Sequence, residues 1–180
     1  MEYCYRLNLP QLDEVLSVTG HNIMSDIILN NISFVKYHPN IIFKTEWLNF
    51  KQKCWDKVFF FYRQNTDGRI HLDDVDSNLN VWSINWIYNG TGLLNFWNLI
   101  DDESYIKTRD KVMSTVYIQT NMPPDKTYYM IPGAYLVNPS YPHQGVGFGN
   151  RLCVSLRCTD SFNMTWNQVI NTFKNQIVLN

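Results

Sequence analysis

Residues 57–74, KVFFFYRQNTDGRIHLDD, contain two short runs of β-forming residues separated by a polar segment. The first run, 57–63, is rich in Val, Phe and Tyr, which favour extended backbone. The second run, 69–74, alternates apolar and polar positions, as a strand with one buried face does. Between them, QNTDG consists of residues typical of turns. This stretch therefore predicts a pair of short strands.

The same alternation of β-type runs and turn segments continues to residue 157. Further strands are expected at 80–88, 93–99, 111–119, 127–131, 133–138 and 151–157. Turn-type segments such as NGTG (89–92) and TNMPPD (120–125) divide most of them. About eight short strands separated by such turn segments predict a mainly β fold, either a sandwich or a jelly-roll barrel.

The 180 residues are expected to form a single domain, because no linker, repeat or low-complexity tract divides the chain. The β-rich core spans about 57–158, and residues 1–56 form an N-terminal flank. In that flank, a short strand at 2–7 and a helix beginning near Pro10 are predicted.

A helix is also predicted at the C-terminal end, over about 165–178. Thr165 and Gln168 have the spacing of a capping box, in which each side chain bonds the backbone of the other residue. Apolar residues then recur at helical spacing. We expect this helix to pack across the outside of the barrel.

Composition argues against several classes of partner. Lys and Arg number 15 and Asp and Glu number 16, so the balance of charge gives no reason to expect nucleic acid or an anionic membrane. The apolar runs are far shorter than the roughly 20 residues that span a bilayer. The four cysteines form no CxxC pair and are interpreted as reduced thiols. With no secretory signal visible, a cytoplasmic location is predicted.

His71 and Asp73 are the first candidate site residues. They lie two apart on a predicted strand, so their side chains point the same way, roughly 6.5–7 Å apart. Two ligands hold a metal poorly, and His143 is the best candidate for a third. Two imidazoles and one carboxylate leave open positions on the metal, which suits non-haem Fe(II).

Arg151 adds a second function to this group. It follows His143 by eight residues, and the Gly-rich segment QGVGFGN (144–150) between them is expected to fold back as a hairpin loop. A guanidinium can pair bidentately with a carboxylate. Together the residues 71, 73, 143 and 151 describe a site for Fe(II) and a chelating keto-diacid, 2-oxoglutarate.

Two longer segments carry a family resemblance. FFYRQNTDGRIHLDDVDSNLNVWSINWIYNG (60–90) and IPGAYLVNPSYPHQGVGFGNRLCVSLRC (131–158) resemble the Fe(II)/2-oxoglutarate-dependent dioxygenases. The resemblance is strongest to small, often phage-encoded oxygenases related to aspartyl/asparaginyl β-hydroxylases. It covers roughly residues 57–158 and implies a double-stranded β-helix, the cupin-like jelly roll, with flanking helices.

The resemblance also implies roles for particular residues. His71, Asp73 and His143 would hold iron, Arg151 would bind the distal carboxylate of 2-oxoglutarate, and Asn85 would lie near that co-substrate. The implied reaction uses oxygen and decarboxylates 2-oxoglutarate to succinate while hydroxylating a protein or peptide side chain or a small molecule. A phage-encoded enzyme would act in the host cytoplasm.

Two features depart from the family pattern. The interval from His143 to Arg151 is shorter than in the nearest relatives, and Cys153 stands where many members of the wider superfamily have Ser. One hydrogen bond to the co-substrate is therefore in doubt.

Three alternatives remain at this stage. The chain can be a non-catalytic jelly-roll protein, for example a virion-associated assembly component that kept the fold. It can be a cupin-like metal enzyme that uses no 2-oxoglutarate, in which case Arg151 faces solvent or pairs with an internal acid. Finally, His71 can be a core histidine and Asp73 a turn residue, since H-x-D is common by chance. Whether the three ligands turn toward a common point discriminates among them. The sequence predicts no oligomeric state.

Overall fold

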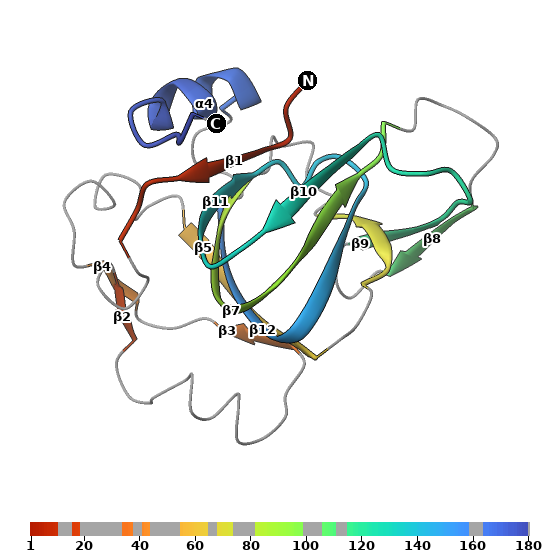
Figure 1. Ribbon diagram of the computed structural model, residues 1–180, viewed down its shortest axis with the longest axis horizontal. Coiled ribbons are helices and arrows are strands. Elements are labelled where there is room, and N and C mark those ends of the chain that lie inside the picture. The colour runs from red at the N-terminus through yellow and green to blue at the C-terminus, as the bar shows by residue number, and fades with distance from the viewer. Residues whose placement is uncertain are drawn as a thin grey trace.

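The computed structural model describes residues 1–10, 16–18, 34–37, 41–43, 55–64, 68–73, 82–98, 106–110, 115–158 and 164–179. This part of the chain is mainly β, with antiparallel pairing throughout and the helix α4 (Trp166–Phe173) (Figure 1). The strands are β1 (Cys4–Leu7), β2 (Leu16–Val18), β3 (Phe34–Tyr37), β4 (Ile41–Phe43), β5 (Trp55–Gln64), β6 (Ile70–Leu72), β7 (Trp82–Phe96), β8 (Ile106–Asp110), β9 (Thr115–Gln119), β10 (Lys126–Met130), β11 (Gly133–Val137) and β12 (His143–Cys158). Among the described residues, no helix has the length and apolar character needed to cross a membrane.

Two long neighbouring strands, β7 and β12, organise the main sheet. They pair with each other from one end to the other. On the far side of β7, its first half pairs with β11 and its second half with β10. On the far side of β12, β5 pairs with the second half and β6 with the first residue. Each long strand therefore belongs to two half-sheets, and the predicted double-stranded β-helix is confirmed.

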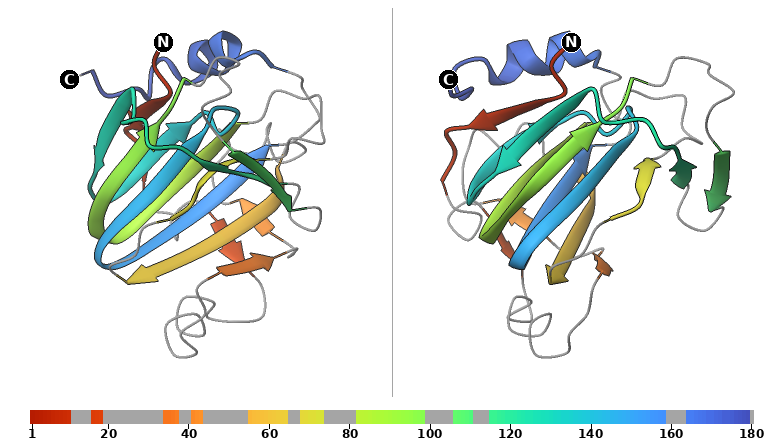
Figure 2. Two further views of the ribbon diagram at one scale, coloured as in Figure 1. Left: turned by 90° about the vertical axis from the view of Figure 1, so that its right-hand side faces the viewer. Right: turned by 45° about the vertical axis from the view of Figure 1, so that its right-hand side comes forward.

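Glycines allow β7 and β12 to bend between these half-sheets (Figure 2). Gly90 and Gly149 have φ angles of 68° and 69°, in the left-handed region that glycine adopts without strain. The two strands also approach closely, because a Cβ built at Gly92 would lie 2.1 Å from the carbonyl oxygen of Val146. The register between the strands shifts just after Phe148, where an irregularity ends the first half of β12.

These glycines were predicted to reverse the chain, and that prediction is wrong. NGTG (89–92) was expected to separate two strands, but it lies inside the single strand β7. QGVGFGN (144–150) was expected to form a hairpin loop, but it belongs to β12. The physical reason is that Gly92, Gly145 and Gly147 are paired within the ladder, while Gly90 and Gly149 lie at its irregularity, where the strands bend and then resume pairing.

The first half of β7 has two different faces. Ser83 and Asn85 line an internal cavity between the half-sheets. Trp82, Ile84 and Trp86 alternate with them and are at most 2% exposed. These three apolar side chains belong to the core, and the polar residues between them face the cavity.

The C-terminal helix lies beside β1, at the opposite end of the sheet from β8 (Figures 1 and 2). Its predicted capping box is confirmed, since Gln168 N donates to Thr165 Oγ1 and the Gln168 side chain accepts from Thr165 N. Phe173 is buried, and its ring lies edge-on to Trp82 at 5.6 Å. The helix ends at Phe173 and not near residue 178, because Ile177 bridges to Leu7 in β1 instead.

The N-terminal flank is only partly described. β1 pairs with β11, so the first residues belong to the main sheet, as the predicted strand at 2–7 suggested. The helix predicted near Pro10 falls mostly on residues outside the described part, and Leu16–Val18 form the strand β2. His21 and His38 also lie outside the described residues.

Candidate metal centre

Two histidines on neighbouring strands face each other across the cavity. His71 in β6 and His143 at the start of β12 are paired in register, and their ring centroids are 4.3 Å apart. His71 Nδ1 lies 2.8 Å from the carbonyl oxygen of Arg69, and His143 Nδ1 lies 2.9 Å from that of Tyr141. A carbonyl oxygen can only accept, so both Nδ1 atoms carry the proton and donate it. In this tautomer each imidazole has its lone pair on Nε2, the atom that can bind a metal.

Asp73 supplies a carboxylate between these two imidazoles. Its Oδ1 lies 3.6 Å from His71 Nε2, and its Oδ2 lies 3.5 Å from His143 Nε2. The Asp73 backbone N donates to the carbonyl oxygen of Pro139, which ties the end of β6 to the loop before His143. The carboxylate therefore faces the two lone pairs and not solvent, with 5% of its side chain exposed.

The three donors fit a single metal ion. Potential ligand atoms of His71, Asp73 and His143 all lie within 4.8 Å of one another. A first-row metal holds such atoms about 2.0–2.2 Å away, so donors about 3.5 Å apart can share one ion after a small contraction. Two imidazoles and one carboxylate on one side of a metal form the facial set typical of non-haem Fe(II), with positions left for other ligands. This group can hold a metal, and the donor chemistry does not identify which one.

A buried cation lies in the same cavity. Arg151, on the second half of β12, is 7% exposed and lines the cavity together with the three donors. Its Nε is buried, and within the described part of the chain no acceptor lies at hydrogen-bond distance from it. Desolvating a guanidinium without a counter-charge is costly. The arrangement therefore favours an anionic ligand inside the cavity.

Asn85 also faces this space. It lines the cavity from β7, and its Oδ1 is buried without a hydrogen-bond partner among the described residues. A side-chain amide has both acceptor and donor atoms, so it can meet either a donor or an acceptor on a ligand. The cavity thus contains two polar groups whose bonding capacity the described residues leave unfilled.

All five residues singled out from the sequence, His71, Asp73, Asn85, His143 and Arg151, line this one cavity. Cys153, a departure from the family pattern, also lines the cavity. The sequence did not single out the other six lining residues, which are Ser83, Leu94, Val137, Pro139, Gly145 and Ser155. Strand alternation was the available signal for two of them. Ser83 lies two residues from Asn85, and Ser155 lies four residues from Arg151.

Trp97 lies near the centre but does not line this cavity. It is 3% exposed, and its Nε1 donates to the carbonyl oxygen of Met122 at 2.9 Å. Trp97 N also donates to the carbonyl oxygen of Pro142, next to His143. The residue therefore supports the neighbourhood of the centre without facing it.

Comparisons with known proteins give structural likeness only. No protein-family profile and no curated protein sequence matches the chain. The ribosomal oxygenase YcfD from Escherichia coli, solved with cobalt and 2-oxoglutarate, is 10% identical with a TM-score of 0.47, over 95% of this chain and 56% of that chain. Hydroquinone 1,2-dioxygenase from Sphingomonas sp. TTNP3 is 7% identical with a TM-score of 0.38, over 58% of this chain and 59% of that one. The dTDP-4-dehydrorhamnose 3,5-epimerase from Bacillus anthracis is 9% identical with a TM-score of 0.39, over 85% and 81% of the two chains.

The chain thus spans little more than half the length of YcfD. At identities of 7–10% and TM-scores below 0.5, none of these proteins identifies what this chain does. None of the three is described as a phage protein, so the expected phage origin gains no support.

Proposed function

We propose that the chain is an Fe(II)- and 2-oxoglutarate-dependent oxygenase. The observation that carries the proposal is that one cavity contains three residues able to share a metal ion and a buried arginine for which the described residues supply no ion-pair partner. The triad suits a metal with open positions, and the arginine suits the far carboxylate of a chelating diacid. Iron with bound 2-oxoglutarate would supply oxidative decarboxylation to succinate coupled to hydroxylation of a substrate.

The protein's own residues would prepare this chemistry by geometry. The carbonyl oxygens of Arg69 and Tyr141 hold both imidazoles with Nε2 toward the metal. Arg151 would pair with the distal carboxylate of the co-substrate, and Asn85 would bond it from the neighbouring strand. Leu94 and Val137 contribute apolar walls, which limit the water around these charges.

Oxygen and substrate would approach on the side of His71. The His71 side chain is 21% exposed, compared with 9% for His143 and 5% for Asp73. The open positions of the metal would therefore be reached from the β6 side. The substrate, a protein or peptide side chain or a small molecule, would bind there.

Two competing interpretations have less support. A non-catalytic jelly-roll protein has no need to turn three ligand atoms toward a common point, as His71, Asp73 and His143 do. A metal enzyme without 2-oxoglutarate predicts Arg151 at the surface or beside an internal acid. Arg151 is instead buried, and no described carboxylate forms an ion pair with it.

The test uses His143→Ala, which removes one of the two Nε2 donors. Under anaerobic conditions the wild-type protein should bind Fe(II), and on exposure to oxygen it should convert 2-oxoglutarate to succinate. The variant should lose both, as measured by metal analysis after gel filtration and by succinate quantification. Asn121→Ala, at an exposed position outside the cavity, is the control and should keep both. Wild-type rates of iron-dependent succinate formation in His143→Ala would contradict the proposal.

A further inference from the structure

A row of aromatic rings supports His143 from behind. The Phe96 ring lies 5.8 Å from the His143 imidazole between centroids, at an interplanar angle of 31°. Tyr3 stacks on Phe96, with the ring centroids 4.9 Å apart and an interplanar angle of 20°. Phe96 is 0% exposed and Tyr3 is 5% exposed, so both rings are packed within the core. Tyr3, near the start of the sequence, is thus separated from the proposed metal ligand His143 by the single ring of Phe96.

Tyr3 also contacts the segment that fixes the His143 tautomer. Its ring lies 4.7 Å from the ring of Tyr141, whose carbonyl oxygen accepts the proton of His143 Nδ1. The carbonyl oxygen of Tyr3 accepts from Asn138 N at 2.9 Å, at the start of the loop that leads to His143. Tyr3 is therefore linked to His143 by two routes, through the Phe96 ring that packs against the imidazole and through the segment 138–142 that precedes it.

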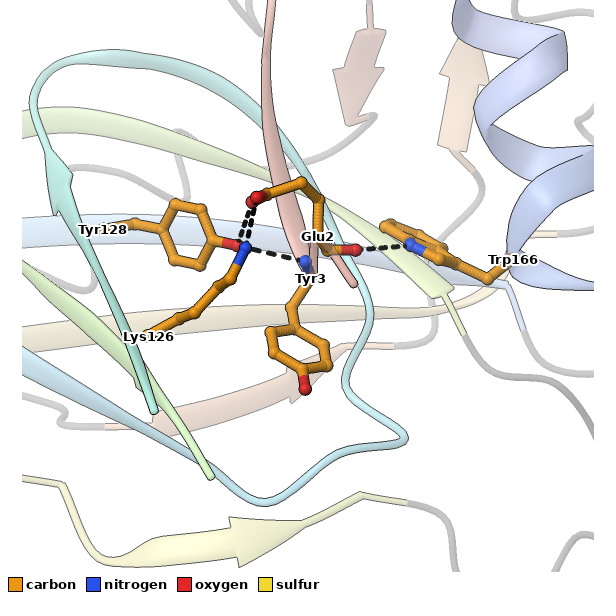
Figure 3. A network of polar contacts seen from close by, with 5 residues as sticks. All are labelled: Glu2, Tyr3, Lys126, Tyr128 and Trp166. Atoms are coloured by element: carbon orange, nitrogen blue, oxygen red, sulfur yellow. Dashed lines mark hydrogen bonds and ion pairs between the residues drawn. The ribbon is translucent and has the colours of Figure 1, made fainter. Parts of the chain in front are cut away.

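Four residues in turn hold Tyr3 in place, and we call them the N-terminal clasp: Glu2, Lys126, Tyr128 and Trp166 (Figure 3). The Glu2 carboxylate forms an ion pair with Lys126 and accepts from Tyr128 Oη at 2.6 Å. Tyr128 Oη accepts from Tyr3 N at 3.1 Å, so one hydroxyl joins the carboxylate to the Tyr3 backbone.

The clasp joins three distant parts of the chain. Trp166, the first residue of α4, donates from Nε1 to the carbonyl oxygen of Glu2 at 2.8 Å, while Lys126 and Tyr128 belong to β10. The hydrogen bonds from Lys126 and Tyr128 lower the pKa of Glu2 below its ordinary value. Glu2 is therefore ionised at neutral pH, and its pairing with Lys126 is present under ordinary conditions.

We infer that Tyr3 is a positioning residue for the metal centre. The N-terminal clasp holds Tyr3 against Phe96 and Tyr141, and His143 thereby keeps Nε2 aimed at the metal. The inference rests on the proposed function only in taking His143 as a metal ligand. Partners that orient a ligating histidine are typically worth 10–100-fold in metal affinity or activity. Tyr3 acts one contact further out, and its effect should lie near the lower end of that range.

The experiment compares Tyr3→Leu with Tyr3→Phe, using Co²⁺ as the probe. Leu keeps apolar bulk but loses the ring that stacks on Phe96, and Phe keeps that ring. Titration followed by the visible absorption of bound Co²⁺ should give about 10-fold weaker binding and an altered spectrum for Tyr3→Leu. Tyr3→Phe should restore the wild-type affinity and spectrum. Tyr129→Leu, at a 62% exposed tyrosine on the same sheet, is the matched control and should bind as wild type does.

A second variant keeps the inference testable if Tyr3→Leu does not fold. Tyr128→Phe removes the hydroxyl that bonds Tyr3 N and Glu2, but it leaves the ring that packs edge-on to Phe96 at 5.8 Å. It should weaken Co²⁺ binding relative to the wild type, by less than the roughly 10-fold change expected for Tyr3→Leu, and circular dichroism should show an unchanged fold.

The outcomes separate the inference from the proposed function. Wild-type protein that binds no Co²⁺ would overturn both. If the wild type binds Co²⁺ and the folded Tyr3→Leu binds it equally well with the same spectrum, only the positioning role of Tyr3 fails. If Tyr3→Leu is unfolded, unchanged binding by Tyr128→Phe overturns the inference in the same way.

Discussion

His71 and His143 use the same backbone contact to present their ligand atoms. Each Nδ1 bonds the carbonyl oxygen of the residue two positions earlier, Arg69 and Tyr141. Arg69 and Tyr141 lie just before β6 and β12, so each contact joins an imidazole to the segment that leads into its own strand. For His143 that segment is itself packed against Tyr3, through the ring of Tyr141.

Arg151 gives the clearest prediction at the scale of a residue. Arg151→Ala should raise the concentration of 2-oxoglutarate needed for half-maximal succinate formation, because it removes hydrogen bonds to a charged group. Such bonds are worth about 1.5–3 kcal/mol, which corresponds to roughly 10–150-fold. Initial rates over a range of 2-oxoglutarate concentrations measure the change, and Co²⁺ affinity should stay near that of the wild type.

The matched control for this prediction is Arg6→Ala. Arg6 is an exposed arginine on β1, and the one described hydrogen bond of its side chain is a long one to the carbonyl oxygen of Pro132. Its loss should leave the requirement for 2-oxoglutarate unchanged. An unaltered requirement in Arg151→Ala would rule out the proposed carboxylate pairing.

The residues that line the site were easier to predict from the sequence than the residues that pack behind them. The spacing of His71 and Asp73 predicts a shared face from strand geometry alone. Tyr3 gave no such signal, because its role depends on Phe96 and Tyr141, which are distant in sequence. Contacts of that kind follow from tertiary packing, which no local pattern in the chain encodes.

Among the elements, the bend in β7 depends on close approach to β12. Gly92→Ala would place a Cβ 2.1 Å from the carbonyl oxygen of Val146, and a backbone atom cannot move aside as a flexible side chain can. Overpacking of this kind costs about 1–3 kcal/mol, so the free energy of unfolding should fall by at least that amount. Denaturation in urea, followed by tryptophan fluorescence, measures it.

Gly145→Ala is the control for this substitution. The nearest heavy atom to a Cβ at Gly145 is Arg151 Nη1 at 3.5 Å, an ordinary contact distance. Its unfolding free energy should stay close to that of the wild type. Equal stability of Gly92→Ala and the wild type would show that the two strands separate more easily than their pairing indicates.

The elements also show where local sequence is informative. The capping box at Thr165 was predictable because both partners lie within one helical turn. The glycine-rich segments 89–92 and 144–150 misled the prediction, since glycine serves turns and bends equally well. Only the pairing of β7 with β12 distinguishes these uses, and that pairing joins residues up to 76 positions apart (Trp82 and Cys158).

For the whole molecule, metal binding should stabilise the fold. A ligand at 100 times its dissociation constant contributes about 2.7 kcal/mol when it binds only the folded state. For a chain of this size that corresponds to a rise of roughly 5–10 °C in Tm. Thermal unfolding with and without Co²⁺ measures the shift, and EDTA should reverse it. His143→Ala should show no comparable rise, and a similar rise in that variant would place the metal elsewhere.

The fold class could be predicted at this scale because eight or so β-type runs leave few alternatives to a sheet closed on itself. The contribution of the first residues could not. Glu2 and Tyr3 contact Lys126, Tyr128 and Trp166, which lie more than 120 residues further along the chain. A contact between residues so far apart in the sequence produces no periodic pattern of residue types in either segment, so it cannot be predicted from local sequence.

The strand β12 carries both His143 and Arg151, so one continuous backbone sets the spacing between metal and counter-charge. Adding or deleting a single residue between them would turn the second half of the strand to the opposite face, and the guanidinium would leave the cavity. Partners on both edges of β12 would resist any compensating slip. Over evolutionary time, this segment should accept changes of amino-acid type far more readily than insertions or deletions. The number of residues between His143 and Arg151 therefore sets how far the guanidinium lies from the metal centre in this chain.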